Sequence, residues 1–136
     1  MDRLTRLFAS VLREQAIVRV QGPIRLGPDS EPQPDLALLR PRADFYAQAH
    51  PGPEDVRLVV EVAETSAEYD RTVKLPLYAR SGIREVWLVD LATVSVEVCS
   101  DPTPGGYQRV RSIRRGERLT LGAFPRMELA ADDLLG

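Results

Sequence analysis

The stretch Leu58-Val59-Val60-Glu61-Val62 decides the fold, because it would be apolar on both faces of an extended chain except at Glu61. Such a pattern is typical of a strand in the centre of a sheet that is covered on both sides. A carboxylate in the middle of that strand is energetically costly unless it is paired, hydrogen-bonded or bound to a cation. Glu61 therefore needs a partner elsewhere in the chain.

Periodicity predicts the elements around this strand. Apolar residues at helical spacing predict an amphipathic helix over 4–12. Thr65 followed by Glu68 matches a capping box, which predicts a helix over 65–80 that ends at Gly82 and is distorted near Pro76. Strands are expected at 17–20, 35–39, 56–62, 85–90, 94–98, 107–113 and 118–121, with a long loop over 40–55 and a C-terminal tail over 132–135. This order predicts one domain over residues 1–136, of class α/β (α+β), with a mixed sheet flanked by helices.

Composition excludes several classes of protein. The 136 residues are 43% hydrophobic and 28% charged, as in a globular protein with one core. No apolar run approaches the roughly 20 residues of a membrane helix, and the N-terminus does not resemble a secretory signal. Cys99 is the only cysteine, so no disulfide forms within the chain. These features predict a cytoplasmic location.

The same composition restricts the chemistry that the chain can perform. The only histidine, His50, lies in a Pro-Gly-rich segment, so neither a zinc site of several His and Cys ligands nor a histidine-based triad is expected. Glycine-rich phosphate-binding motifs are absent. A metal, if the chain uses one, should be a hard cation held by carboxylates, namely Mg²⁺ or Mn²⁺.

Two acidic residues and one lysine form the candidate site. Asp70, Lys74 and Tyr78 recur every four residues, so the helix after the Glu61 strand can place Lys74 over the end of that strand. Asp35 opens an earlier strand and would lie beside Glu61 if the two strands pair. Carboxylates that hold Mg²⁺, with a lysine that positions the attacking water, suit phosphodiester hydrolysis.

Each of these residues also has a structural explanation. Asp70 and Lys74 can form an i,i+4 ion pair at the surface, worth about 0.3–0.5 kcal/mol. Asp35 follows Pro34 and can simply end a turn. Glu61 resists such an explanation, because valines precede and follow it.

The order of the motifs resembles a known family. It is carried by Glu31-Pro32-Gln33-Pro34-Asp35-Leu36, Leu58 to Val62, Thr65-Ser66, Tyr69-Asp70-Arg71, Lys74-Leu75-Pro76-Leu77-Tyr78-Ala79 and Gly82 to Asp90. This pattern is similar to that of the Uma-two family of restriction-endonuclease proteins, in the PD-(D/E)XK nuclease superfamily. The resemblance spans almost the whole chain. It implies a core sheet flanked by helices, with a divalent-metal site at the strand ends.

The resemblance also assigns roles to residues. It implies that Asp35 and Glu61 bind the metal and that Lys74 completes the catalytic set, because Ala63 occupies the usual position of the lysine. Asp70 would orient Lys74 or hold a water, and Tyr78 shares that helical face. Family members generally carry a further N-terminal segment, with strands and an acidic residue, before the helix with which this chain begins. Any acidic group from that segment would be missing here.

Nucleic acid as a partner does not follow from overall charge, since the net charge is −2. Local contacts with nucleic acid are expected at Arg71, near the site, and at Arg109 and Arg111, on one face of a strand. These arginines can equally be solvated side chains that balance nearby acids. The leading hypothesis is a Mg²⁺-dependent endonuclease that acts on DNA, for which duplex cutting suggests a homodimer. The alternative is a noncatalytic protein of the same fold that serves as a nucleic-acid-binding or dimerisation module.

Overall fold

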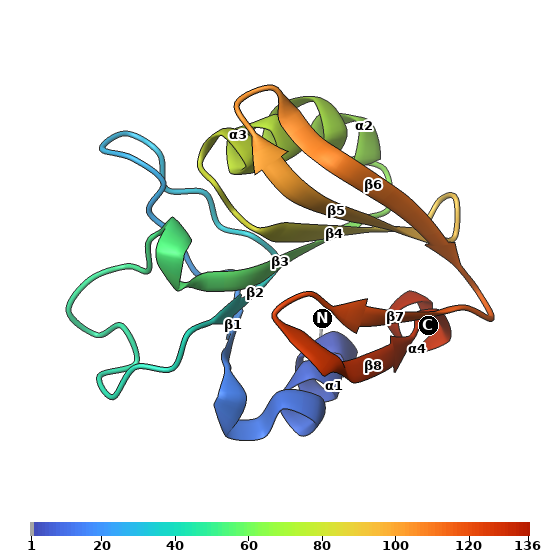
Figure 1. The fold of residues 1–136 in the computed structure, drawn as a ribbon, viewed down its shortest axis with the longest axis horizontal. Coiled ribbons are helices and arrows are strands. Elements are labelled where there is room, and N and C mark those ends of the chain that lie inside the picture. Colours follow the sequence, from blue (N-terminus) through green and yellow to red (C-terminus); the bar gives the residue numbers. More distant parts are fainter. Residues whose placement is uncertain (1) are drawn as a thin grey trace.

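The computed structural model describes residues 2–136 and contains a six-stranded sheet in the order β1-β2-β3-β4-β5-β6 (Figure 1). Within it, β3 and β4 are parallel and the other neighbouring strands are antiparallel. The fold is therefore the predicted mixed α/β arrangement. The strands of this sheet are β1 (Ile17–Val20), β2 (Leu36–Leu39), β3 (Val56–Ala63), β4 (Glu85–Asp90), β5 (Ser95–Thr103) and β6 (Gly106–Arg114).

A helical crossover joins the parallel strands β3 and β4, as that pairing requires. It consists of α2 (Ala67–Tyr69), the π-helical segment η3 (Asp70–Lys74) and α3 (Leu75–Arg80). The predicted start at Thr65 is wrong, because Ser66 is the N-cap residue and no side chain caps the helix. The expected distortion near Pro76 lies just before it, where the helix widens into the π-helical turn.

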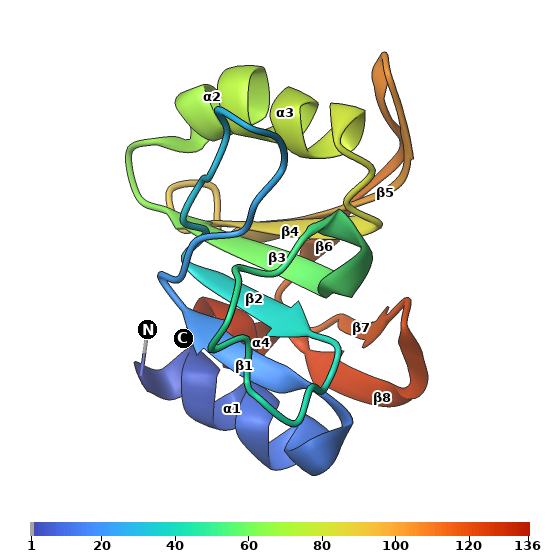
Figure 2. The ribbon, with the colours of Figure 1, turned by 90° about the vertical axis from the view of Figure 1, so that its left-hand side faces the viewer.

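The opposite side of the sheet is covered by α1 (Asp2–Leu12), α4 (Ala131–Leu135) and a hairpin of β7 (Arg118–Leu121) and β8 (Phe124–Ala130), as Figure 2 shows. Two short 3₁₀ helices, η1 (Arg13–Gln15) and η2 (Pro53–Asp55), complete the set. The prediction of a C-terminal tail over 132–135 is wrong. This segment is helical because Leu134 and Leu135 are buried in the core.

The sheet separates two hydrophobic cores. We call the side under α1, α4 and β7–β8 the hairpin face and the side under α2, η3 and α3 the crossover face. On β3, Leu58 and Val60 belong to the core of the hairpin face, while Val59 belongs to that of the crossover face. Alternation along the strand therefore directs Glu61 toward the crossover helices.

No helix in residues 2–136 has the length and apolar character needed to cross a membrane.

Candidate active site

Strand register brings Asp35 and Glu61 together. Leu36 of β2 pairs with Val60 of β3, so Asp35, immediately before β2, lies opposite Glu61. The backbone N–H of Asp35 donates to Glu61 Oε1 at 3.1 Å. In return, the backbone N–H of Val62 donates to Asp35 Oδ2 at 2.7 Å. These two hydrogen bonds fix both carboxylates at the end of the β2–β3 ladder.

The crossover helices supply the other polar groups of the site. Lys74 Nζ lies 3.2 Å from Glu61 Oε2 and 3.8 Å from Asp70 Oδ1. The hydroxyl of Tyr78 donates to Glu61 Oε2 at 2.7 Å. One helical face thus places Asp70, Lys74 and Tyr78 above the end of β3, and the π-helical turn lies between the first two. The structure brings together all five residues singled out from the sequence for this site.

Burial controls the protonation of these groups. Glu61 is 1% exposed, and burial raises its pKa despite the opposing effects of the Tyr78 hydroxyl, the Asp35 amide and Lys74. Burial likewise raises the pKa of Asp70. For Lys74, burial alone lowers the pKa, but the charge and hydrogen bond of Glu61 outweigh it and the pKa is raised. Lys74 therefore remains an ammonium group at neutral pH.

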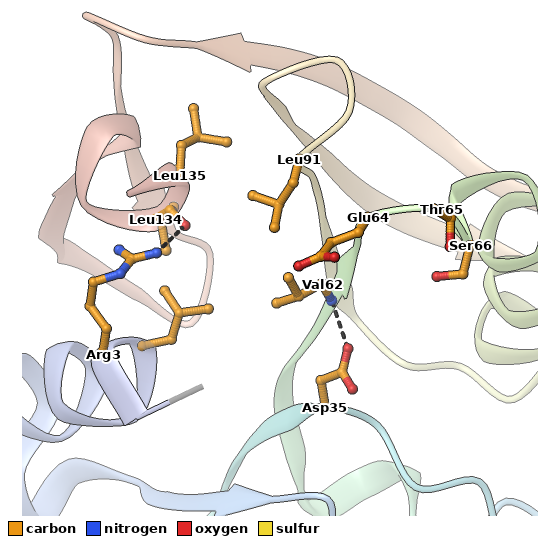
Figure 3. Close-up of a pocket in the computed structure, with 10 residues that line it drawn as sticks. Arg3, Asp35, Val62, Glu64, Thr65, Ser66, Leu91, Leu134 and Leu135 are labelled. Carbon is orange, nitrogen blue, oxygen red and sulfur yellow. Dashed lines mark hydrogen bonds between the residues drawn. The ribbon is translucent and has the colours of Figure 1, made fainter.

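A hollow of about 490 Å³ opens beside this cluster (Figure 3). Asp35 lines it together with the polar residues Glu64, Thr65 and Ser66, whereas Glu61 and Lys74 are not among its lining residues. Its opposite wall is mainly apolar and comes from α1 and α4, with Arg3, Leu4, Leu134 and Leu135, while the apolar Val62 and Leu91 lie at the ends of β3 and β4. Asp35 therefore connects the buried cluster to a space that a ligand can enter.

The donor set fits a hard divalent cation. Residues 2–136 contain no group of three or more Asp, Glu, His or Cys side chains placed to hold a metal ion. Mg²⁺, however, is usually bound by one or two carboxylates together with waters and substrate phosphates. Asp35 Oδ1 accepts no hydrogen bond from the described residues, and both oxygens of Glu61 are engaged. A cation held by both carboxylates would thus compete with Lys74 for Glu61.

The structure places the three arginines that are predicted to bind nucleic acid on two different sides of the sheet. Arg71 donates to Glu97 at 2.7 Å and to Asp90 at 2.8 Å, so its guanidinium ties η3 to β5 and β4. Arg109 and Arg111 lie on β6, where register with β5 directs them to the hairpin face. The three arginines do not form one patch, and their contact with nucleic acid stays a prediction.

Sequence reasoning missed several residues that support the site. The ion pairs of Arg71 with Asp90 and Glu97 were not expected, although Asp90 ends an apolar strand much as Glu61 interrupts one. Three of the polar residues that line the hollow, Glu64, Thr65 and Ser66, follow β3 directly. Their position after the strand that carries Glu61 is the signal that could have identified them.

We expect Arg71→Ala to lower the free energy of unfolding by about 2 kcal/mol, because Asp90 would remain buried without its cation. Burial raises the pKa of Asp90, but the hydrogen bond from Arg71 and its other partners outweigh it and leave the pKa lowered from 3.8. This pair therefore stabilises the fold above about pH 4 and loses that effect as the pH falls further. Urea unfolding between pH 7 and pH 3 should show the variant's deficit shrinking with acid. A deficit that grows toward pH 3 would contradict this assignment.

Replacing Lys74 with methionine should cost about 2–3 kcal/mol of stability, since Glu61 and Asp70 would keep buried charge without a cation. This is less than for a fully buried pair, because the Lys74 side chain is 29% exposed. In the double variant Glu61→Gln/Lys74→Met, the loss should fall short of the sum of the single losses by about 1–2 kcal/mol. Urea unfolding of the four proteins measures this difference. Additive losses would show that the two side chains do not interact.

The fold and the site together define a class of protein. The mixed sheet, in which an aspartate before β2 is joined to a glutamate of β3 beneath a helical lysine, defines an α/β protein with a buried carboxylate–lysine site. The chain belongs to the Uma2 family, described as "Putative restriction endonuclease", whose pattern matches residues 1–132.

A solved structure supports the fold. The crystal structure of a "putative nuclease belonging to DUF820" from Anabaena variabilis ATCC 29413 superposes with a TM-score of 0.76 at 16% identity. The match covers 98% of this chain and 76% of the other. A search of curated proteins found no match.

Proposed function

We propose that this protein is a Mg²⁺-dependent endonuclease in which Asp35 and Glu61 hold the metal and Lys74 assists the attacking water. The proposal rests on one observation, namely that the carboxylate of Glu61 contacts both Asp35 and Lys74. Its Oε1 accepts from the Asp35 amide and its Oε2 lies 3.2 Å from Lys74 Nζ. A buried carboxylate joined to a second acid and a cationic donor is costly to maintain without a function. Membership in a family described as restriction endonucleases supports the same chemistry.

Each residue has a distinct task in this proposal. A divalent cation, when bound, polarises the scissile phosphate and lowers the pKa of water. Lys74 donates a hydrogen bond to the attacking water and stabilises the negative charge that develops on the phosphate oxygens. Asp70 and Tyr78 hold Lys74 and Glu61 in place through the contacts described above. Water adds to phosphorus and releases a proton to solvent, the bond to the leaving oxygen breaks, and that oxygen takes up a proton from solvent.

DNA is the proposed substrate, and Mn²⁺ is expected to replace Mg²⁺ because both accept oxygen ligands. Cutting both strands of a duplex requires two sites, which favours a homodimer. We place the reaction in the cytoplasm, since the chain has one cysteine and no apolar run long enough to span a membrane.

Incubation of the purified protein with plasmid DNA tests the proposal. Cutting should appear with Mg²⁺ or Mn²⁺ and disappear with a chelator, and Glu61→Gln and Lys74→Met should each lower its rate strongly. Equal cutting by the wild type and both variants would assign the activity to another site or to a contaminant. DNA binding without cutting by the wild type would instead support a noncatalytic nucleic-acid-binding module of the same fold.

A further inference from the structure

A second hollow, of about 380 Å³, lies on the hairpin face where the turn between β7 and β8 approaches the start of β4. Four arginines line it, and they come from three separate parts of the chain. Arg57 belongs to β3, Arg84 immediately precedes β4, and Arg109 and Arg111 lie on β6. Folding therefore gathers positive charges that are dispersed in the sequence. We call this site the arginine hollow.

Most of these arginines lack a carboxylate partner. Within residues 2–136, no ion pair forms at Arg57, Arg84 or Arg111. Arg109 lies 3.9 Å from Asp101, and both side chains are about two-thirds exposed, so that pair is weak. Like charges around one hollow repel each other, and an anion between them would relieve the repulsion.

Two carboxylates also line the hollow, and they do not neutralise it. Glu85 accepts hydrogen bonds from the backbone N–H of Gly122 at 2.8 Å and from Trp87 Nε1 at 3.0 Å. Its oxygens are thus engaged by neutral donors rather than by the arginines. The lining contains four guanidinium groups and the two carboxylates of Glu85 and Asp101, so the hollow carries an excess of two positive charges. This local excess stands out in a chain whose net charge is −2.

We propose that the arginine hollow binds phosphate groups, supplied either by successive phosphodiesters of a nucleic-acid strand or by a free pyrophosphate-type ligand. Guanidinium groups are planar forks that bind phosphate oxygens in pairs, so four of them suit two adjacent phosphates. The volume of the hollow lies within the range of about 300–1,000 Å³ that is usual for ligand pockets. Neutral or cationic ligands would leave the excess charge uncompensated.

The arginine hollow is separate from the Asp35–Glu61 site. Arg111 pairs with Val98, which belongs to the core of the hairpin face, whereas Glu61 faces the crossover helices on the other side of the sheet. Phosphate binding here therefore does not rest on the proposed nuclease activity. A failure of either proposal leaves the other standing, because one is tested by cutting and the other by binding.

Equilibrium binding of two probes tests the inference. Inorganic pyrophosphate is titrated by calorimetry, and a fluorescent single-stranded oligodeoxynucleotide by anisotropy, without divalent metal. Arg84→Gln/Arg111→Gln removes two exposed charges from the hollow, and Arg6→Gln/Arg126→Gln removes two exposed charges elsewhere as a matched control. The hollow variant should bind at least tenfold more weakly than the wild type to whichever probe occupies the hollow. The control should remain within twofold.

The two probes distinguish the sources of phosphate. Loss of oligonucleotide binding, with a salt slope reduced by about 1.4 for two lost contacts, assigns the hollow to a nucleic-acid strand. Selective loss of pyrophosphate binding assigns it to a free phosphate ligand. Equal weakening in both variants would indicate attraction by overall charge and overturn the inference. Unchanged affinity in the hollow variant, or no binding of either probe to the wild type, would overturn it as well.

Discussion

Glu61→Gln should lower the rate of Mg²⁺-dependent DNA cutting by about a thousandfold, which corresponds to about 4 kcal/mol in the activation barrier. The amide keeps nearly the same size but removes the negative charge. It also leaves only one acceptor oxygen for the Asp35 amide, the Tyr78 hydroxyl and Lys74. The substitution therefore weakens the attraction for a divalent cation and, at the same time, the contact that positions Lys74.

Single-turnover cutting of plasmid DNA, followed over a range of Mg²⁺ concentrations, measures this effect. Glu68→Gln is the matched control, because Glu68 is an exposed glutamate at the start of the same crossover. The control should cut at the wild-type rate. Far-UV circular dichroism checks that both variants fold. Cutting by folded Glu61→Gln within tenfold of the wild type would remove Glu61 from the proposed site.

The sequence was sufficient to predict the centre of the fold, because burial leaves a direct pattern there. A carboxylate flanked by valines marks Glu61 as buried and partnered, and i,i+4 spacing places Lys74 and Tyr78 on one helical face. The structure shows the contact between Lys74 and Glu61 directly. Local periodicity carried this information, since each of these residues lies within a regular element.

Elements at the end of the chain were harder to predict. Strand β8 contains Pro125 and Arg126, and only Leu129 within it is buried, so the usual alternation is weak. Helix α4 is too short to show a helical period and forms where Leu134 and Leu135 reach the core. Such elements depend on tertiary contacts rather than on local preference. The same holds for the arginine hollow, whose members are far apart in sequence.

Trp87→Ala should cause the largest loss of stability in the molecule. Trp87 is fully buried on the hairpin face, with its ring centroid 6.0 Å from that of Phe8. Its truncation leaves a large cavity, which costs about 3–5 kcal/mol. It also removes the indole N–H from the buried carboxylate of Glu85, at a further cost of about 1–3 kcal/mol. The total approaches the whole stability of an ordinary domain, about 5–15 kcal/mol.

A conservative replacement separates these two contributions. Trp87→Phe fills most of the space but cannot donate a hydrogen bond, so it should cost about 1–3 kcal/mol, and exposed Val110→Ala should cost less than about 0.5 kcal/mol. Urea unfolding is followed by circular dichroism, because Trp87 is the only tryptophan and its variants lose indole fluorescence.

Glu85 also holds the β7–β8 turn through Gly122, where a β-carbon would lie 2.8 Å from Glu85 Oε1. The hairpin should therefore loosen first in Trp87→Ala, seen as faster amide exchange over β7 and β8 than over β3. Equal amide exchange rates in the β7–β8 hairpin and in β3 would show that Trp87 stabilises the six-stranded sheet but not the hairpin in particular.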